Sequence, residues 1–133
     1  MVGRFAMMIG AMAIGVPAAA QPVSQAELDD AVRLGRVATL APLCGMREES
    51  WSFDVRRATL FDATKAPRPD DHTLATVPGG EQVTGALSFA EAEALEDFAE
   101  APAAATCGKL AGSADLQRAD ALVAAFRARK TGS

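Results

Sequence analysis

The sequence predicts an all-α protein of four main helices, with one short extra helix, arranged as two helical hairpins. Two stretches carry apolar residues at helical spacings behind a Ser-x-x-Glu pair, the pattern of a capping box in which each side chain bonds the backbone N–H of the other residue. The chain also has two cysteines, Cys44 and Cys107, far apart in sequence. We expect one disulfide between them and one long loop rich in Pro and Gly.

The first twenty residues have the pattern of an export signal. Arg4 is the only charge before Glu27, residues 5–16 are apolar or Gly, and Ala18–Ala20 provides a small-x-small cleavage site. The apolar run is shorter than the roughly 20 residues that a membrane-spanning helix needs. We therefore expect residues 1–20 to be a cleaved signal peptide and residues 21–133 to form a single helical domain. A retained N-terminal membrane helix is the alternative.

Export decides the compartment and the chemistry of the cysteines. We expect a periplasmic or secreted protein without stable membrane insertion, and in such an oxidising setting two cysteines pair. The chain-entropy model gives about 4 kcal/mol of stabilisation for closing a loop as long as that between Cys44 and Cys107. Loss of Arg4 with the signal changes the formal charge from −4 to −5. An acidic protein of this kind is not expected to bind nucleic acid.

The first predicted hairpin begins behind the capping box of Ser24 and Glu27. Its first helix carries apolar residues at spacings of two to four, namely Leu28, Val32, Leu34, Val37, Leu40 and Leu43. Pro42 should kink or end this helix, and Gly45 is a natural stop. The second helix is expected over residues 47–63, with an inward face of Trp51, Val55, Ala58 and Phe61.

Residues 64–85 separate the two hairpins. They contain three prolines and three glycines, so they predict a long loop, which in a compact domain is usually functional or disordered.

The second hairpin is expected to begin with a second capping box, formed by Ser88 and Glu91. The helix behind it carries Phe89, Ala92, Leu95, Phe98 and Ala99. Pro102 then interrupts and is expected to open a short helix that ends near Leu110. A last helix is predicted over residues 114–129, with Leu116, Ala119, Leu122, Val123 and Phe126 facing inward.

The two halves share a further pattern. Each has Ser-x-Ala-Glu at its start and a Cys-Gly pair about twenty residues later. An old duplication is one interpretation; the other is chance, because both patterns are common.

Residues for catalysis are few. The only His is His72, which follows Asp70 and Asp71 in a Pro-flanked turn, and no Ser lies in a nucleophile motif. Three adjacent ligands rarely reach one ion, so we expect a polar turn there and no metal or other cofactor. We do not expect an enzyme.

The carboxylates of one helix form a possible partner surface. Glu93, Asp97 and Glu100 fall on one face, within a long segment that has no basic residue. This face is either solvated or a docking surface for a basic partner segment.

Two stretches, LCGMREESWSFDVRRA and ATCGKLAGSADLQRADALV, resemble parts of small exported all-helical proteins of unknown function from proteobacteria that contain a single disulfide. The resemblance implies export, helices and the disulfide, and no activity. We expect a non-enzymatic periplasmic or secreted interaction or accessory protein, for example in the envelope or in stress. The alternative is a helical protein that binds a small molecule or lipid in an apolar pocket.

Overall fold

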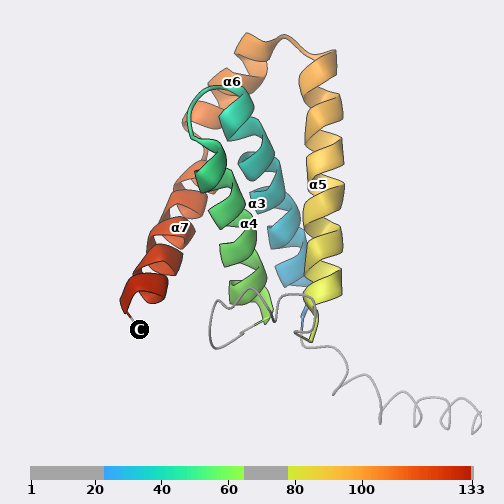
Figure 1. Ribbon diagram of the computed structural model, residues 1–133. Helices are drawn as coiled ribbons and strands as arrows, with labels where there is room; N and C mark the ends of the chain where they lie inside the picture. Colours follow the sequence, from blue (N-terminus) through green and yellow to red (C-terminus); the bar gives the residue numbers. More distant parts are fainter. Residues whose placement is uncertain (1–22, 65–77, 133) are drawn as a thin grey trace, which may run out of the picture.

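The computed structural model describes residues 23–64 and 78–132 (Figure 1). The predicted signal peptide, the loop residues 65–77 and the Asp70-Asp71-His72 turn lie outside these ranges. Within them, the chain forms five helices and no strand, which confirms the all-α prediction. The helices are α3 (Gln25–Leu43), α4 (Glu49–Thr64), α5 (Gly80–Glu100), α6 (Ala103–Ala111) and α7 (Ala114–Gly132).

Helix α3 is the centre of the fold. It contacts each of the other four helices, with α4 and α5 as its main neighbours, and α7 packs on α3 and α4 (Figure 1). The arrangement as two hairpins is not confirmed, because α5 and α7 lie on opposite sides of the α3–α4 pair and α6 bridges them across one end of the molecule.

Both ends of α3 follow from local sequence. At its start, Ser24 Oγ accepts the Glu27 N–H at 3.1 Å and the Ser24 N–H donates to Glu27 Oε1 at 2.9 Å, so the predicted capping box is confirmed. At its end, Gly45 has a φ of 71°, and the Met46 N–H bonds the Ala41 carbonyl. This is the Schellman turn that glycine favours, and it ends the helix at Leu43, one residue after Pro42.

The start of α5 differs from the prediction. The helix begins at Gly80, behind Gly79 with a φ of 83°, so residues 80–85 are helical and are not part of a loop. Ser88 and Glu91 therefore lie in the helix interior, and the second capping box is wrong. The proposed correspondence between the halves loses its first element, since Ser24 caps a helix and Ser88 does not.

The inward face of α5 is made of smaller residues than expected. Phe89 and Leu95 are 59% and 47% exposed, while Val83, Ala90 and Ala94 are fully buried. These small side chains allow α5 to approach α3 closely. A Cβ built on Gly35 of α3 would lie 2.8 Å from the Cβ of Ala90, shorter than real contacts of this kind.

The predicted inward faces of the other helices are confirmed for most of their residues, but Leu43 at the end of α3 is exposed and Leu122 of α7 is only partly buried. Trp51, Val55, Ala58 and Phe61 of α4 are buried, and so are Leu116, Ala119, Val123 and Phe126 of α7. The Phe61 and Phe126 rings stack with centroids 6.2 Å apart, which ties α4 to α7.

The disulfide joins α3 to α6. Cys44 and Cys107 are bonded, with their Cα atoms 5.7 Å apart, and neither cysteine is free. Helix α6 contributes one buried side chain, Leu110. Its position therefore depends on this single apolar anchor and on the covalent bond.

Candidate functional site

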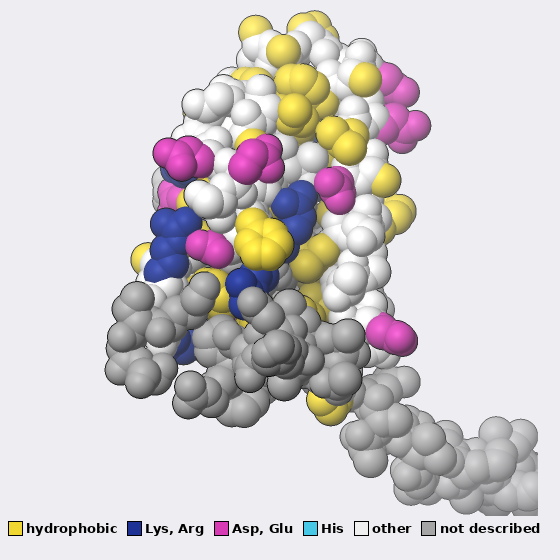
Figure 2. Space-filling view, viewed as in Figure 1, with side chains coloured by type: hydrophobic (Ala, Val, Ile, Leu, Met, Phe, Trp, Pro, Cys, Tyr) yellow, Lys and Arg dark blue, Asp and Glu magenta, His cyan; other side chains and the backbone are white. Residues whose placement is uncertain are grey.

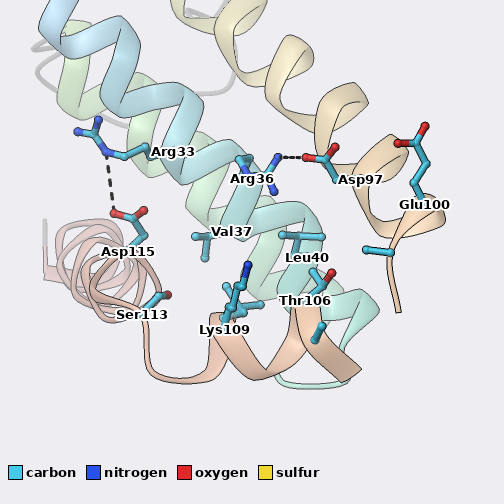
Figure 3. Close-up of a pocket in the computed structure, with 13 residues that line it drawn as sticks. Arg33, Arg36, Val37, Leu40, Asp97, Glu100, Thr106, Lys109, Ser113 and Asp115 are labelled. Atoms are coloured by element: carbon cyan, nitrogen blue, oxygen red, sulfur yellow. Dashed lines mark hydrogen bonds and ion pairs between the residues drawn. The ribbon is translucent and has the colours of Figure 1, made fainter. Parts of the chain in front are cut away.

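A cavity of about 550 Å³ lies between α3, α5, α6 and the start of α7 (Figure 3). This volume is within the range of ordinary ligand sites in proteins, roughly 300–1,000 Å³. It is open to solvent, and it combines an apolar floor with a charged rim. The residues that form the floor are Val37, Leu40, Ala101, Ala105 and Leu110.

One face of α3 forms the first wall. Arg36 and Val37 lie three and four residues after Arg33, and Leu40 lies three residues after Val37, so the four side chains lie along the same side of the helix. Val37 and Leu40 are buried, whereas the two guanidinium groups reach the surface. Val37 and Leu40 belong to the apolar face predicted for this helix, whereas no role was predicted for the two arginines.

The opposite wall is α6. Leu110 is held in the core and Cys107 is bonded to the end of α3, so Thr106 and Lys109 from the same helix line the cavity. Figure 3 shows the Lys109 side chain extending from α6 toward Val37 and Leu40. The disulfide, predicted as a staple, thus also fixes the wall of the cavity.

Helix α5 supplies the predicted acidic residues. Asp97 accepts a hydrogen bond from Arg36 at 2.8 Å, and Glu93 lies 3.9 Å from the same guanidinium. Glu100 lines the cavity with Asp97 and forms no ion pair with any residue of the described ranges. The three carboxylates therefore share one side of α5 as predicted, but Arg36 engages two of them. Whether this side binds a partner stays a prediction.

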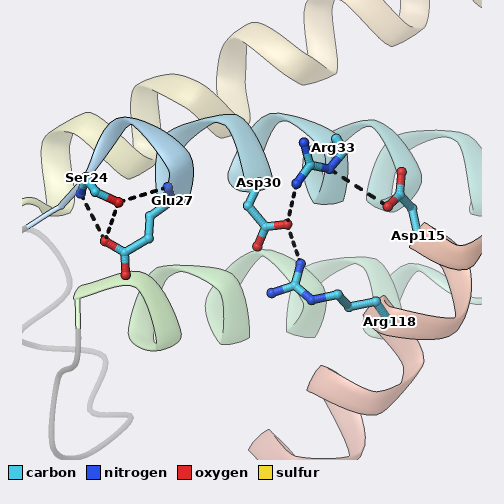
Figure 4. A network of polar contacts seen from close by, with 6 residues as sticks. All are labelled: Ser24, Glu27, Asp30, Arg33, Asp115 and Arg118. Carbon is cyan, nitrogen blue, oxygen red and sulfur yellow. Dashed lines mark hydrogen bonds and ion pairs between the residues drawn. The ribbon is translucent and has the colours of Figure 1, made fainter.

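The arginine at the other end of the rim is oriented by a separate network (Figure 4). The Asp30 carboxylate accepts a hydrogen bond from Arg33 at 3.1 Å and another from Arg118 of α7, and Asp115 lies 3.9 Å from Arg33. Alternating charges thus connect α3 and α7, and their mutual pairing leaves this end of the rim close to neutral.

Lys109 differs from both arginines. No carboxylate within residues 23–64 or 78–132 pairs with its ammonium group, although it lies beside the apolar floor. The other ionised group of the lining without such a partner is Glu100, and its carboxylate points along α5, away from Lys109 (Figure 3).

A second polar cluster lies outside the cavity, between α4 and α7. Arg47 donates two hydrogen bonds to the Asp120 carboxylate, at 3.0 and 2.6 Å, and the buried Trp51 donates its indole N–H at 2.8 Å. The hydrogen bond from Arg47 lowers the pKa of Asp120. Partial burial opposes this shift by raising the pKa, and the hydrogen bond from Trp51 lowers it further. The Asp120 carboxylate of α7 thus holds Trp51 of α4 and Arg47 of the turn that precedes α4, so the cluster has a structural role.

An apolar surface forms the third feature. Figure 2 shows apolar side chains gathered on the upper part of the face where α3, α4 and α5 meet, above a group of basic ones. Leu43 and Leu95 line a shallow hollow of about 150 Å³ there, and both are nearly half exposed. Phe53, which is 58% exposed, lies on α4 with Arg57 over its ring.

The described part of the chain contains no group of three or more His, Cys, Asp or Glu residues arranged to hold a metal ion. None of its helices is both long and apolar enough to cross a membrane. No protein-family profile matches the chain, and no curated protein or solved structure is significantly similar to it.

Proposed function

We propose that this chain is an exported, non-enzymatic binding protein and that the cavity between α3, α5, α6 and α7 is its binding site. The observation that supports this most directly is the composition of the cavity, in which an apolar floor lies beside the ammonium of Lys109, which pairs with no carboxylate of the described residues. Such a site buries the apolar part of a ligand and orients it through a few polar groups.

The non-enzymatic part of the proposal rests on the sequence, which offers no nucleophile with a base beside it. The export part rests on the pattern of residues 1–20. The bonded Cys44–Cys107 pair supports it, because disulfides persist in oxidising compartments.

The test is to block the cavity and measure what the protein retains. The protein is purified from its native host under non-denaturing conditions, and bound small molecules are released and identified by mass spectrometry. Ala105→Trp places a large ring among the floor residues, whereas Ala104→Trp, next to it on α6 but outside the lining, is the matched control. Retention of a compound by the wild type and the control, with loss in Ala105→Trp, is the expected result. Equal retention in all three proteins would contradict the proposed site.

A protein partner is the second candidate function, and the exposed apolar side chains of Leu43 on α3 and Leu95 on α5 favour it. Contiguous exposed apolar side chains are a feature of protein-interaction surfaces, and Leu43 and Leu95 line one hollow. Crosslinking in the native envelope tests this function. Leu95→Gln is the variant, and Phe89→Gln, on the other side of α5, is the control. Capture of one partner that is lost only with Leu95→Gln supports this function, and equal capture by all forms opposes it.

A further inference from the structure

We propose that the ligand of the cavity is an anionic amphiphile, with a single carboxylate head and an unbranched aliphatic body. This inference rests on the proposed function and adds the chemical class of the ligand. The geometry that carries it is the position of Lys109, an ammonium group without a carboxylate partner in the described ranges, beside the apolar floor of Val37, Leu40 and Leu110.

The ion pairs at the rim of the cavity indicate the sign of the charge on the ligand's head group. Asp97 is engaged by Arg36 at 2.8 Å, and Asp115 faces Arg33 at 3.9 Å. The carboxylate of Glu100 points away from Lys109. The lining as a whole carries three cations and three carboxylates, so the sign depends on the local pairing. Arg33 and Arg36 each face carboxylates, whereas Lys109 has none beside it within the described ranges, which favours a ligand with one negative charge at that point.

The geometry of the donors favours a carboxylate. Arg36 donates one Nη1–H to Asp97 and forms no other hydrogen bond within the described ranges. Its remaining N–H groups form part of a planar fork, which matches the two oxygens of a carboxylate. Lys109 contributes a point charge from the opposite wall, so the head group lies between α3 and α6.

The floor determines the body of the ligand. Its side chains are aliphatic, and no aromatic residue lines the cavity. An alkyl chain on such a surface gains affinity with length, by about fourfold for each buried methylene group. The open shape of the cavity leaves room for one end of the chain in solvent.

The experiment compares three probes with the same ten-carbon chain, namely decanoate, 1-decanol and decyltrimethylammonium, each below its micelle concentration. Amide shifts of the ¹⁵N-labelled oxidised protein give the Kd and the location of binding. We expect decanoate to bind about fivefold more tightly than decanol, with shifts at Val37, Leu40 and Leu110, and the cation to bind most weakly. Added salt should reduce the advantage of decanoate, because exposed charges are screened over about 8–10 Å.

Variants separate the charge of Lys109 from its bulk. Lys109→Gln should weaken decanoate about fivefold and leave decanol unchanged, and Lys109→Arg should retain decanoate binding. Glu100→Gln removes a negative charge from the lining of the cavity, so decanoate should bind to this variant as tightly as to the wild type or more tightly. Equal affinity for decanoate and decanol, or tighter binding of the cation, would overturn the anionic class while the cavity remains a binding site. Absence of shifts at the floor residues with all three probes would overturn the cavity itself, and with it the proposed function.

Discussion

Replacing Gly35 by Ala tests the close approach of α3 and α5. The new Cβ would lie 2.8 Å from the Ala90 Cβ and 3.3 Å from both the Leu87 carbonyl oxygen and Cδ2. Two of these three neighbours, the Ala90 Cβ and the Leu87 carbonyl oxygen, are fixed by the backbone of α5, so rotation of a side chain cannot relieve the contact. The two helices must therefore separate by a large fraction of an ångström.

Two effects of opposite sign determine the result. Overpacking a well-packed core costs about 1–3 kcal/mol. Replacement of a helical Gly by Ala gains about 1 kcal/mol of intrinsic helix stability. The expected net effect is a decrease of about 1 kcal/mol in the free energy of unfolding, from the difference between these two principles.

Gly85 of α5 is the matched control. It is also helical, and a Cβ built on it meets nothing within 4 Å. Gly85→Ala should therefore raise the free energy of unfolding by up to about 1 kcal/mol. Urea unfolding of the oxidised protein, followed by circular dichroism, places the two variants about 2 kcal/mol apart.

A compensating substitution locates the effect. Adding Ala90→Gly to Gly35→Ala removes the carbon at 2.8 Å from the new Cβ, so the loss due to that contact should disappear. The contacts with Leu87 at 3.3 Å and the helix propensity of position 90 remain. If Gly35→Ala stabilises the protein as much as Gly85→Ala does, α3 and α5 do not pack as tightly as described, and the reasoning is refuted.

Three further predictions concern covalent structure, charge and processing. Cys44→Ser should lower the free energy of unfolding by about 2–5 kcal/mol in urea, and a loss below about 1 kcal/mol would contradict a stabilising disulfide. Asp120→Asn should destabilise the protein at neutral pH and less so in acid. The folded-state pKa of Asp120 lies below its ordinary value of 3.8, so its stabilising contribution is complete above that value and is lost as the pH falls through the lower one. A difference between wild type and variant that stays constant from pH 7 to pH 3 would exclude this linkage. Finally, intact mass of protein recovered from the native host should correspond to a chain that begins at Gln21, and a retained Met1 would count against the signal peptide.

Local signals in the sequence predicted the elements whose ends depend on local chemistry. The capping box at Ser24 and the stop at Gly45 are short-range hydrogen-bonding patterns, and the structure contains both. The same Ser-x-x-Glu pattern at Ser88 was misleading, because the apolar stripe of α5 already begins at Val83. A Ser-x-x-Glu pattern marks the start of a helix only where the residues before it are not already helical.

The inward face of α5 was harder to predict for a packing reason. Sequence patterns give weight to large apolar residues, which favoured Phe89 and Leu95. Close helix contact at Gly35 instead requires the small, fully buried Ala90. The partner that imposes this requirement lies on another helix, so the sequence of α5 alone does not contain it.

The candidate site was predicted only in part for a similar reason. Asp97 and Glu100 were identified because they share one helix face. Arg36 and Lys109 complete the cavity from α3 and α6, and only the fold brings them together. The sequence does contain one local indication, the spacing of Arg33 and Arg36 along the same side of α3 as Val37 and Leu40.

The position of the disulfide also divides the molecule by chain topology. The bond closes a covalent ring from residue 44 to residue 107, which includes all of α4 and α5, while α3 and α7 are open arms outside it. When the oxidised protein unfolds, the ring limits how far α4 and α5 can separate, but it places no limit on α7. The amides of α7 should therefore exchange with solvent at lower denaturant concentrations than those of α5. Reduction should remove this order, because the ring then becomes an open chain like the arms.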